Sequence, residues 1–375
     1  MQTALPWWRA QQVLQYSGCC SGRGAEIFRR FNTARIDTGG IMEQVSAESA
    51  GAERSHKKLR YLAKQDKTLA WVVILLPLFG TVTAGGLIVA GYAASWRELA
   101  VAALMYLLAL VGVEVGFHRL FAHRSYDASR MTRLFLAICG SMAFEGPVIW
   151  WAATHRRHHQ FSDHDGDPHS PNLSGCGILG TVRGLYHAHM GWLFISSSTR
   201  TTQFSKYAPD LYRDRDIFYV HMHYFMFLLS GFAIPAVIDG ALSMSLWGAF
   251  LGFLWGGLVR IFVMNHLVYW CINSVTHRFG SRPFKTNDNS TNNIWLVLPT
   301  LGQAWHNNHH AFPYSAVMSL QKWQADPGAW ILRMLEHAGL VWNIKVPSRE
   351  RIEAKLGTFA EEAALVGDND ETYTR

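Results

Sequence analysis

Uncharged apolar stretches alternate with polar segments along most of this chain, and four of the stretches are long enough to cross a membrane. A helix needs about 20 mainly apolar residues to span the hydrocarbon core of a bilayer. The pattern therefore predicts four membrane-spanning helices, which short polar connectors join pairwise into two helical hairpins. The expected spans cover residues 69–93, 97–117, 217–238 and 241–270.

The segment between the two hairpins, residues 118–216, contains no stretch that is both long and free of charge. Leu134–Trp151 comes nearest, but a Glu-Gly-Pro triplet interrupts it. We expect this stretch to form an interfacial or re-entrant helix rather than a further span. Arg260 lies within the fourth expected span, where a charged side chain is expected to face the protein interior or to extend toward the interface.

The regions outside the spans divide the chain into three parts. Residues 1–60 are expected to form an N-terminal tail without stable structure, with Met42 as an alternative start, and they lack the apolar core of a signal peptide. Residues 61–347 form the membrane domain, and residues 348–375 form a C-terminal tail. Basic residues just before the first span predict that this end is cytosolic. An even number of crossings then places both termini in the cytosol, and the membrane is the cytoplasmic one if the source is bacterial.

Composition supports a membrane protein. Charged residues make up 16% of the chain, whereas soluble domains carry about 25%. The 15 Trp residues fit this class, because Trp and Tyr collect at membrane interfaces. Positive cytoplasmic loops account for the net charge of +7, so we expect a lipid bilayer and no nucleic acid as partner. The five cysteines contain no C-x-x-C pair and predict no disulfide framework.

Nine of the 18 histidines fall in closely spaced groups beyond the ends of the expected spans. Neutral imidazole is the commonest protein ligand for transition metals, and more than four such ligands predict more than one ion. The even number of crossings brings all the groups to the same membrane face. These candidate metal ligands, which we also expect to be essential for catalysis, are His118, His123, His155, His158, His159, His277, His306, His309 and His310. The other histidines are expected to be ordinary surface or core residues.

The spacing within the groups indicates how two ions would be shared. On an α-helix, residues three and four apart share a face, whereas adjacent residues point about 100° apart. In the sequence HRRHH, His155 and His159 can address one metal while His158 turns toward another. The later segment HNNHH repeats this arrangement. HRLFAH, at 118–123, has a five-residue step that is awkward for an unbroken α-helix, so we expect the second span to end and unwind there.

The ligand types disfavour structural zinc and the soluble di-iron class but leave copper open. Structural zinc sites are tetrahedral, hold four ligands and often contain Cys, which fits nine imidazoles poorly, whereas copper is compatible with imidazole on ligand chemistry alone. Soluble di-iron proteins use Glu-x-x-His pairs, and this spacing occurs only at Glu53–His56, in the expected tail. Nearby carboxylates can orient ligand imidazoles through their second N–H. The candidates for this role are Glu114, Asp163, Asp165 and Asp167.

Four motifs taken together resemble those of the membrane-bound fatty acyl desaturases of the stearoyl-CoA, delta-9 type, in the bacterial form without a cytochrome b5 domain. They are HRLFAH, HRRHHQFSDHDGDPHSP, NHLVYWCINSVTH and GQAWHNNHHAFP. The resemblance runs from about Leu69 to Pro347 in the same order. It implies an all-α membrane protein whose four transmembrane helices are capped by a cytosolic helical domain that carries a histidine-rich di-iron site.

The resemblance also implies a ligand set and a substrate tunnel. One iron would take His118, His123, His155, His159 and His309. The other would take His158, His277, His306 and His310, with Asn273 linked through water. The acyl tunnel would be lined by Trp151 at its bend, by Tyr106 and Leu110 near its closed end, and by Trp270.

The implied reaction is the O2-dependent introduction of a cis double bond into a long-chain fatty acyl group. An acyl-CoA is the expected substrate, with an acyl-carrier-protein or lipid-linked chain as alternatives. Two electrons would come from a ferredoxin or a cytochrome b5-like donor with its NAD(P)H reductase. Three residues depart from the family pattern and put substrate and regiochemistry in question: Gln303 where Glu is usual, Glu145 where Gln is commoner, and Glu114 at a position that is usually small or neutral.

Two other functions use similar residues. A related membrane di-iron hydroxylase or acetylenase begins with the same hydrogen abstraction, so ligand spacing alone does not separate it from a desaturase. A membrane metal carrier would also need histidines, but transport sites usually lie near the middle of the bilayer. The histidines here lie beyond the span ends, and the motif set favours dehydrogenation.

Overall fold

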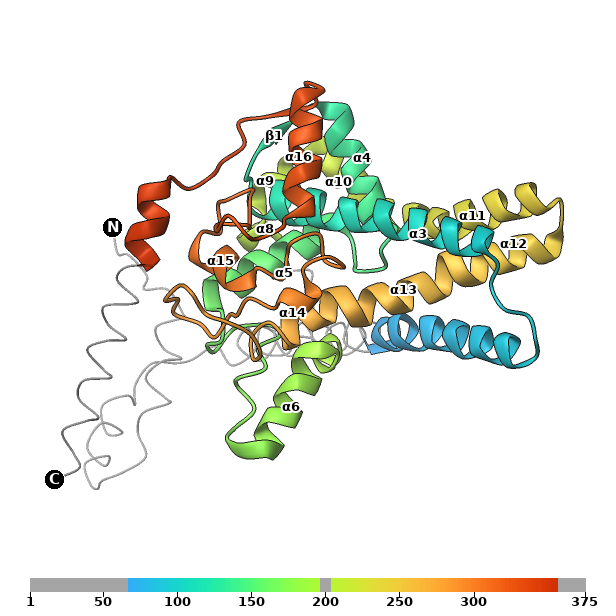
Figure 1. The fold of residues 1–375 in the computed structure, drawn as a ribbon, viewed down its shortest axis with the longest axis horizontal. Helices are drawn as coiled ribbons and strands as arrows, with labels where there is room; N and C mark the ends of the chain where they lie inside the picture. Colours follow the sequence, from blue (N-terminus) through green and yellow to red (C-terminus); the bar gives the residue numbers. More distant parts are fainter. Residues whose placement is uncertain (1–66, 196–203, 357–375) are drawn as a thin grey trace, which may run out of the picture. The chain divides into compact units, whose positions relative to one another are not determined.

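The computed structural model describes residues 67–195 and 204–356, which belong to one compact unit, Tyr61–Arg375. The expected N-terminal tail and most of the expected C-terminal tail lie outside the described residues. The described part is almost entirely helical (Figure 1). Within it, the only strands are β1 (Asp127–Ala128) and β2 (Val341–Trp342), which pair antiparallel.

Four helices are long and apolar enough to cross a membrane, which confirms the expected number of spans. In chain order they are Lys67–Val89, Trp96–Ala122, Tyr224–Ser243 and Leu246–Ser274. The second consists of α3 (Trp96–Val111) and the π-helix η1 (Gly112–Ala122), and the third is α11. The fourth runs on through α12 (Leu246–Gly252), η4 (Phe253–Val259), α13 (Arg260–Val263), η5 (Met264–Tyr269) and α14 (Trp270–Ser274).

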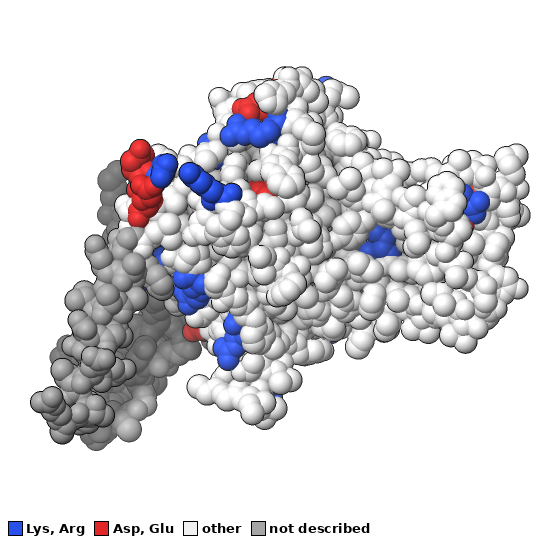
Figure 2. Space-filling model, in the orientation of Figure 1, with Lys and Arg blue, Asp and Glu red and all other residues white. Residues whose placement is uncertain are grey.

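The spans lie on one side of the described unit, and the other helices gather at the opposite end (Figure 1). Lys, Arg, Asp and Glu are sparse on the visible face of the span region and more frequent around the other helices (Figure 2). This distribution suits a bilayer around the spans. The remaining helices are α4 (Arg130–Ser141), α5 (Val148–Phe161), α6 (Gly177–His189), η2 (Gly191–Phe194), α8 (Phe204–Tyr207), α9 (Pro209–Arg213), α10 (Arg215–Met222), η6 (Ile294–Leu296), α15 (His306–Ala311) and α16 (Pro327–His337).

The third span begins later than the expected residue 217. The residues from Ile217 to Met222 belong to α10, a separate helix whose N-cap residue Asp214 accepts a hydrogen bond from the Ile217 N–H at 3.2 Å. His223 then leaves helical geometry, with φ −99° and ψ 21°, and α11 starts at Tyr224. Apolar composition alone could not separate these two helices.

Polar contacts tie the two hairpins together near the start of α3. Arg97 forms an ion pair with the buried carboxylate of Asp239 in α11 and lies 2.6 Å from Glu98. An unpaired charge within a membrane is costly, so this pairing favours the close approach of the two hairpins. Arg260 faces the protein interior, where its guanidinium donates to the carbonyl oxygens of Gly256 (2.7 Å) and Met142 (3.1 Å).

The second span ends at Ala122, within HRLFAH, as expected, but the helix does not unwind before that point, so this part of the expectation is wrong. Residues Gly112–Ala122 form a π-helix, and the His123 N–H donates to the His118 carbonyl oxygen at 3.0 Å. The wider turn places residues five apart on one face, so His118 and His123 point the same way from a continuous helix. Such segments are rare and often mark functional sites. The α-helical period used to interpret the sequence does not reveal them.

The stretch Leu134–Trp151 contributes to two helices, α4 and α5, instead of one interfacial helix. Phe144 and Gly146 break it with positive φ angles of 67° and 92°, and Pro147 is the N-cap residue of α5. The chain therefore turns, and α5 packs against η1. This packing brings HRRHH next to HRLFAH.

We expect Gly112→Ala to destabilise the protein, because a Cβ at this position would lie 2.0 Å from the backbone nitrogen of Gly140 in α4. Overpacking of this kind costs about 1–3 kcal/mol. Gly85→Ala is the matched control, since a Cβ there meets nothing within 4 Å. Thermal unfolding in detergent measures both variants. Equal melting temperatures for the two would contradict the close contact between η1 and α4.

Candidate metal centre

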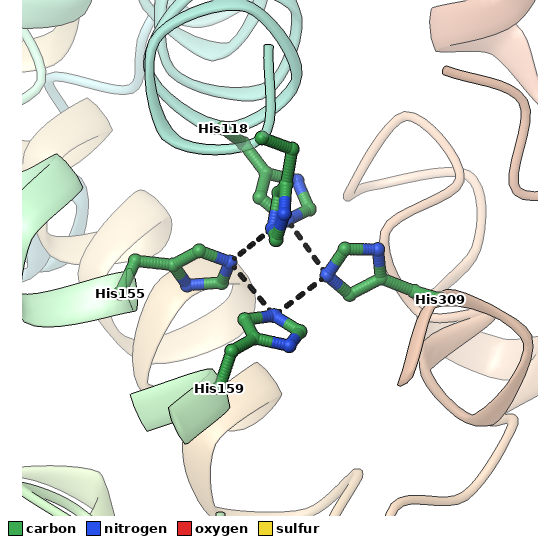
Figure 3. Close-up of side chains that lie close together, drawn as sticks. His118, His155, His159 and His309 are labelled. Carbon is green, nitrogen blue, oxygen red and sulfur yellow. Dashed lines mark hydrogen bonds between the residues drawn. The ribbon is translucent and has the colours of Figure 1, made fainter. Parts of the chain in front are cut away.

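Five imidazoles from three elements converge on the first cluster. η1 supplies His118, the residue after its end is His123, α5 supplies His155 and His159, and α15 supplies His309. One ring nitrogen of each lies within 4.8 Å of those of the others. Neighbouring Nε2 atoms are 2.8 Å apart for His123 and His155, 3.1 Å for His155 and His159, 2.9 Å for His159 and His309, and 3.2 Å for His309 and His118. Figure 3 shows the rings of His118, His155, His159 and His309, which point their nitrogens into one small space.

Four imidazoles form the second cluster: His158, His277, His306 and His310, again with one ring nitrogen of each within 4.8 Å of the others. His277 Nε2 lies 3.0 Å from His306 Nε2. The structure thus brings the nine histidines together in the two sets named from the sequence. α5 and α15 each contribute to both clusters, because adjacent residues on a helix point in different directions.

Carboxylates hold the outer nitrogen of four of these imidazoles. In the first cluster, His118 Nδ1 lies 3.0 Å from a carboxylate oxygen of Glu114. In the second cluster, the Nδ1–oxygen distances are 3.0 Å for His158 and Asp167, 2.9 Å for His277 and Asp163, and 2.6 Å for His310 and Asp288. A carboxylate only accepts, so each Nδ1 carries the proton and donates. The Nε2 lone pair of each ring is then left facing the cluster, as in metal sites with oriented imidazoles.

Sequence reasoning identified three of these carboxylates and missed one. Asp288 lies in a polar loop 22 residues before His310, and nothing in its spacing indicates the contact. Asp165, also a candidate, is exposed and makes no hydrogen bond to a clustered imidazole of the described chain. His169 was assigned no ligand role, yet its ring lies 4.4 Å from that of His158, and it forms a third potential metal-binding group with Asp167.

Burial and neighbouring charge set the protonation of the site. Burial and then the adjacent imidazoles hold the pKa values of His155, His159, His306 and His309 well below 6.5, and they lower that of His310 to about 4. Although burial works in the opposite direction, hydrogen bonds and charge from the paired histidines lower the pKa of Asp163, Asp167 and Asp288. Most of these imidazoles are therefore neutral at pH 7 and offer lone pairs.

The nitrogen positions fit metal ions better than they fit hydrogen bonds. Each Nε2 has either one proton or one lone pair, so at most two of the four short contacts in the first cluster can be hydrogen bonds at once. In the second cluster, His310 Nε2 is buried and has no hydrogen-bond partner among the described residues. A cation at the centre of each cluster would turn these opposed lone pairs into ligands, and imidazole suits several first-row metals.

Two neighbouring cavities approach the second cluster. The inner one, of about 40 Å³, is lined by His158, His306, Asn273 and Trp151, whose indole stacks on His155 at 5.0 Å. The outer one, of about 320 Å³, is mostly apolar and includes span residues such as Leu69, Val73 and Trp270. Glu145, Trp150 and Trp192 line both.

The remaining residues named from the sequence lie around this core. Tyr106 and Leu110 line neither cavity: the Tyr106 hydroxyl donates to the Pro299 carbonyl oxygen at 2.7 Å, and Leu110 is packed in the main apolar core. Gln303 is buried and lines the inner cavity. The outer nitrogens of His306 and His309 have no partner among the described residues, so Gln303 does not replace a carboxylate there.

We expect Asp288→Asn to weaken metal binding at the second cluster by about 10- to 100-fold, the usual effect of losing a carboxylate that orients a ligand imidazole. Asp216→Asn is the control, because that carboxylate pairs with the exposed Arg130, 2.6 Å away. Metal per protein, measured by mass spectrometry after dialysis against a graded chelator, separates the two. Equal retention in both variants would show that Asp288 does not support a metal ligand.

Comparisons with known proteins agree with the site. The sequence model of the fatty acid desaturase family matches residues 94–343. A hex-5-enoyl-[acyl-carrier protein] acetylenase of Moorena producens is 44% identical over 283 residues, covering 75% of this chain and 87% of that protein. The delta-9 acyl-lipid desaturase 1 of Arabidopsis thaliana is 38% identical, covering 68% and 78%, and an acyl-CoA C20 delta5-desaturase of Anemone leveillei is 37% identical, covering 68% and 76%. The chain is thus an integral membrane oxidoreductase that belongs to the fatty acid desaturase family.

Proposed function

We propose that this protein binds two iron ions and uses O2 to introduce a cis double bond into a long-chain fatty acyl group. The observation that carries the proposal is the pair of adjacent all-histidine clusters, five and four imidazoles, at the end of four apolar helices. Imidazole suits iron as well as zinc and copper, and membership of the desaturase family favours iron.

The chain's own residues would hold and tune the two ions. Four carboxylates fix the ring orientation and tautomer of their imidazoles, which raises the basicity of the inward nitrogens. Burial of His118, His306 and His309, all at most 2% exposed, keeps bulk water from these ligands. When bound, the ions would supply O2 activation, so that two hydrogens leave adjacent methylenes as O2 and two electrons, with two further protons, yield two waters.

The protein must position the acyl chain, since a saturated chain offers no directing group. We propose that the outer cavity, with Trp270, admits the chain and that Trp151, stacked on His155, bends it past the clusters. Tyr106 and Leu110 would close the far end. Asn273, which lines the inner cavity with His158 and His306, would reach the second ion through water.

The carrier and the bond position are part of this proposal. An acyl-CoA attacked at position 9 is the substrate that the motifs favour. The relatives named above act on acyl chains carried by acyl carrier protein, CoA or lipid, at positions that include 5 and 9. The electrons would come from a ferredoxin or a cytochrome b5-like protein with an NAD(P)H reductase. Both termini would lie in the cytosol, and the membrane would be the cytoplasmic one in a bacterium.

A second candidate is an acetylenase, which removes hydrogens from an existing double bond. The 44% identity to an acetylenase favours it, and the same clusters would serve. Acyl-chain profiling with location of the unsaturation decides between the two. A new monoene from a saturated chain supports the desaturase, whereas an alkyne formed only from a supplied monoene supports the acetylenase. Unchanged acyl chains in cells that express active donor proteins would refute both.

We expect His158→Ala and His306→Ala to lower product formation by at least about 100-fold, because each removes a ligand of the second cluster. His337→Ala, an exposed histidine at the end of α16, should retain full activity. Gas chromatography of acyl esters from expressing cells measures the product, and immunoblotting checks the amount of protein. Full activity of either cluster variant would contradict the assignment.

We expect Leu110→Ala to shift the accepted chain length upward by about two carbons if Leu110 closes the tunnel, since the space gained approximates two to three methyl-sized groups. The buried position also predicts a loss of stability of about 2–5 kcal/mol. Competition between acyl chains of 14 to 20 carbons reads out the preference independently of the amount of folded enzyme. An unaltered length profile in the folded variant would remove Leu110 from the tunnel.

A further inference from the structure

The place where the two cavities meet is more polar than a channel for a hydrocarbon chain requires. We call it the neck and define it by Glu145, Trp150 and Trp192, which line both cavities. Tyr269 lines the inner cavity together with these three. The neck lies between the mostly apolar outer cavity and the residues of the second cluster. Any substrate that reaches His158 and His306 through the outer cavity passes it.

The backbone holds Glu145 at the neck at a conformational cost. Its neighbours Phe144 and Gly146 both have positive φ, 67° and 92°. A bulky residue in this region is strained, and such strain clusters at functional sites. The Gly146 N–H donates to the Tyr224 hydroxyl at 3.2 Å, and a Cβ on Gly146 would lie 2.6 Å from the Trp150 ring. The turn is therefore fixed from both sides.

Three polar groups here have no partner within the described part of the chain. The indole N–H of Trp192 and the hydroxyl of Tyr269 are buried, at 4% and 5% exposure, and neither makes a hydrogen bond. The Glu145 carboxyl likewise makes no hydrogen bond or ion pair with a described residue, and burial raises its pKa to about 8. A carboxyl that keeps its proton at pH 7 is a donor, so all three groups can donate.

These three unpaired hydrogen-bond donors indicate which chemical group a ligand must offer. A polar group that is left unpaired away from water is destabilising, and a methylene chain would leave all three unpaired. A carbonyl oxygen has two lone pairs and no proton, so it can accept hydrogen bonds from two of these three donors at once. A cation or an ammonium group would face donors and is disfavoured.

We propose that Glu145, Trp192 and Tyr269 bind the carbonyl oxygen of the acyl thioester substrate. The proposal rests on the proposed function and names the group of the substrate that the enzyme recognises. Anchoring the carbonyl at the neck fixes how many carbons separate it from the metal clusters. The position of the new bond is then counted from the carbonyl end, and the apolar outer cavity serves for entry of the chain.

The experiment compares thioesters with thioethers, in which a methylene replaces the carbonyl. The probes are acyl-CoA and S-alkyl-CoA with chains of 6 and 18 carbons. Titration calorimetry on the metal-loaded enzyme, without O2 or electron donor, gives Kd with no turnover. For the better-bound length, wild type should prefer the thioester about 3- to 10-fold, the worth of a net hydrogen bond. Glu145→Leu should bring the ratio close to one, and Glu145→Gln, which still donates, should fall between.

Glu336→Leu is the matched control: it makes the same chemical change at a partly exposed carboxylate paired with Arg333, and it should keep the wild-type ratio. If Glu145→Leu does not fold, Trp192→Phe tests the same site by removing one donor. A wild-type ratio of one, an unchanged ratio in Glu145→Leu, or tighter binding of free octadecanoate than of its thioester would each overturn the proposal. Unsaturated product with a ratio of one would reject only the neck site, whereas absence of product would reject the proposed function.

Discussion

The arrangement of this protein depends on histidine ring nitrogens whose lone pairs face one another across two small spaces. Nine imidazoles are held in two clusters, and carboxylates accept hydrogen bonds from the outer ring nitrogens of four of them. Nitrogen atoms about 3 Å apart cannot all share protons, so the clusters are satisfied only by positive charge at their centres. The two clusters differ in charge: three aspartates support the second, whereas the first has Glu114, which Arg119 shares at 3.2 Å. The second centre should therefore stabilise the higher total positive charge.

The membrane-spanning helices serve this arrangement by delivering histidines to one place. The π-helix η1 places His118 and His123 on one face, and close packing at Gly112 lets α4 approach it. The turn at Phe144–Pro147 then sends α5 back against η1. At the other end, the ion pair between Arg97 and Asp239 joins the hairpins. Backbone geometry and buried charge pairs thus position the ligands, and the apolar faces of the spans are left for lipid.

The sequence predicted the parts that depend on local patterns. Apolar length identified four spans, and the three- and four-residue spacings of HRRHH and HNNHH divided their histidines between two sets, as the structure has them. It failed where geometry departs from the α-helical period, as in η1, and where a helix ends inside an apolar run, as at His223. Asp288 was missed because its contact with His310 depends on how a polar loop folds. The neck was also beyond reach, since it arises from strained backbone and from side chains that lie far apart in the sequence.

The shared helices have a consequence for how the two clusters would load metal ions. Because α5 and α15 each contribute ligands to both clusters, an ion in the five-histidine cluster would also order the helices that carry three of the four ligands of the other cluster. Binding of the first ion already includes the entropic cost of ordering those helices. The second ion should therefore bind with higher affinity than the first. Protein that carries a single ion would then be scarce at every stage of loading. Cells with a limited supply of metal would contain a mixture of protein molecules with two ions and protein molecules with none.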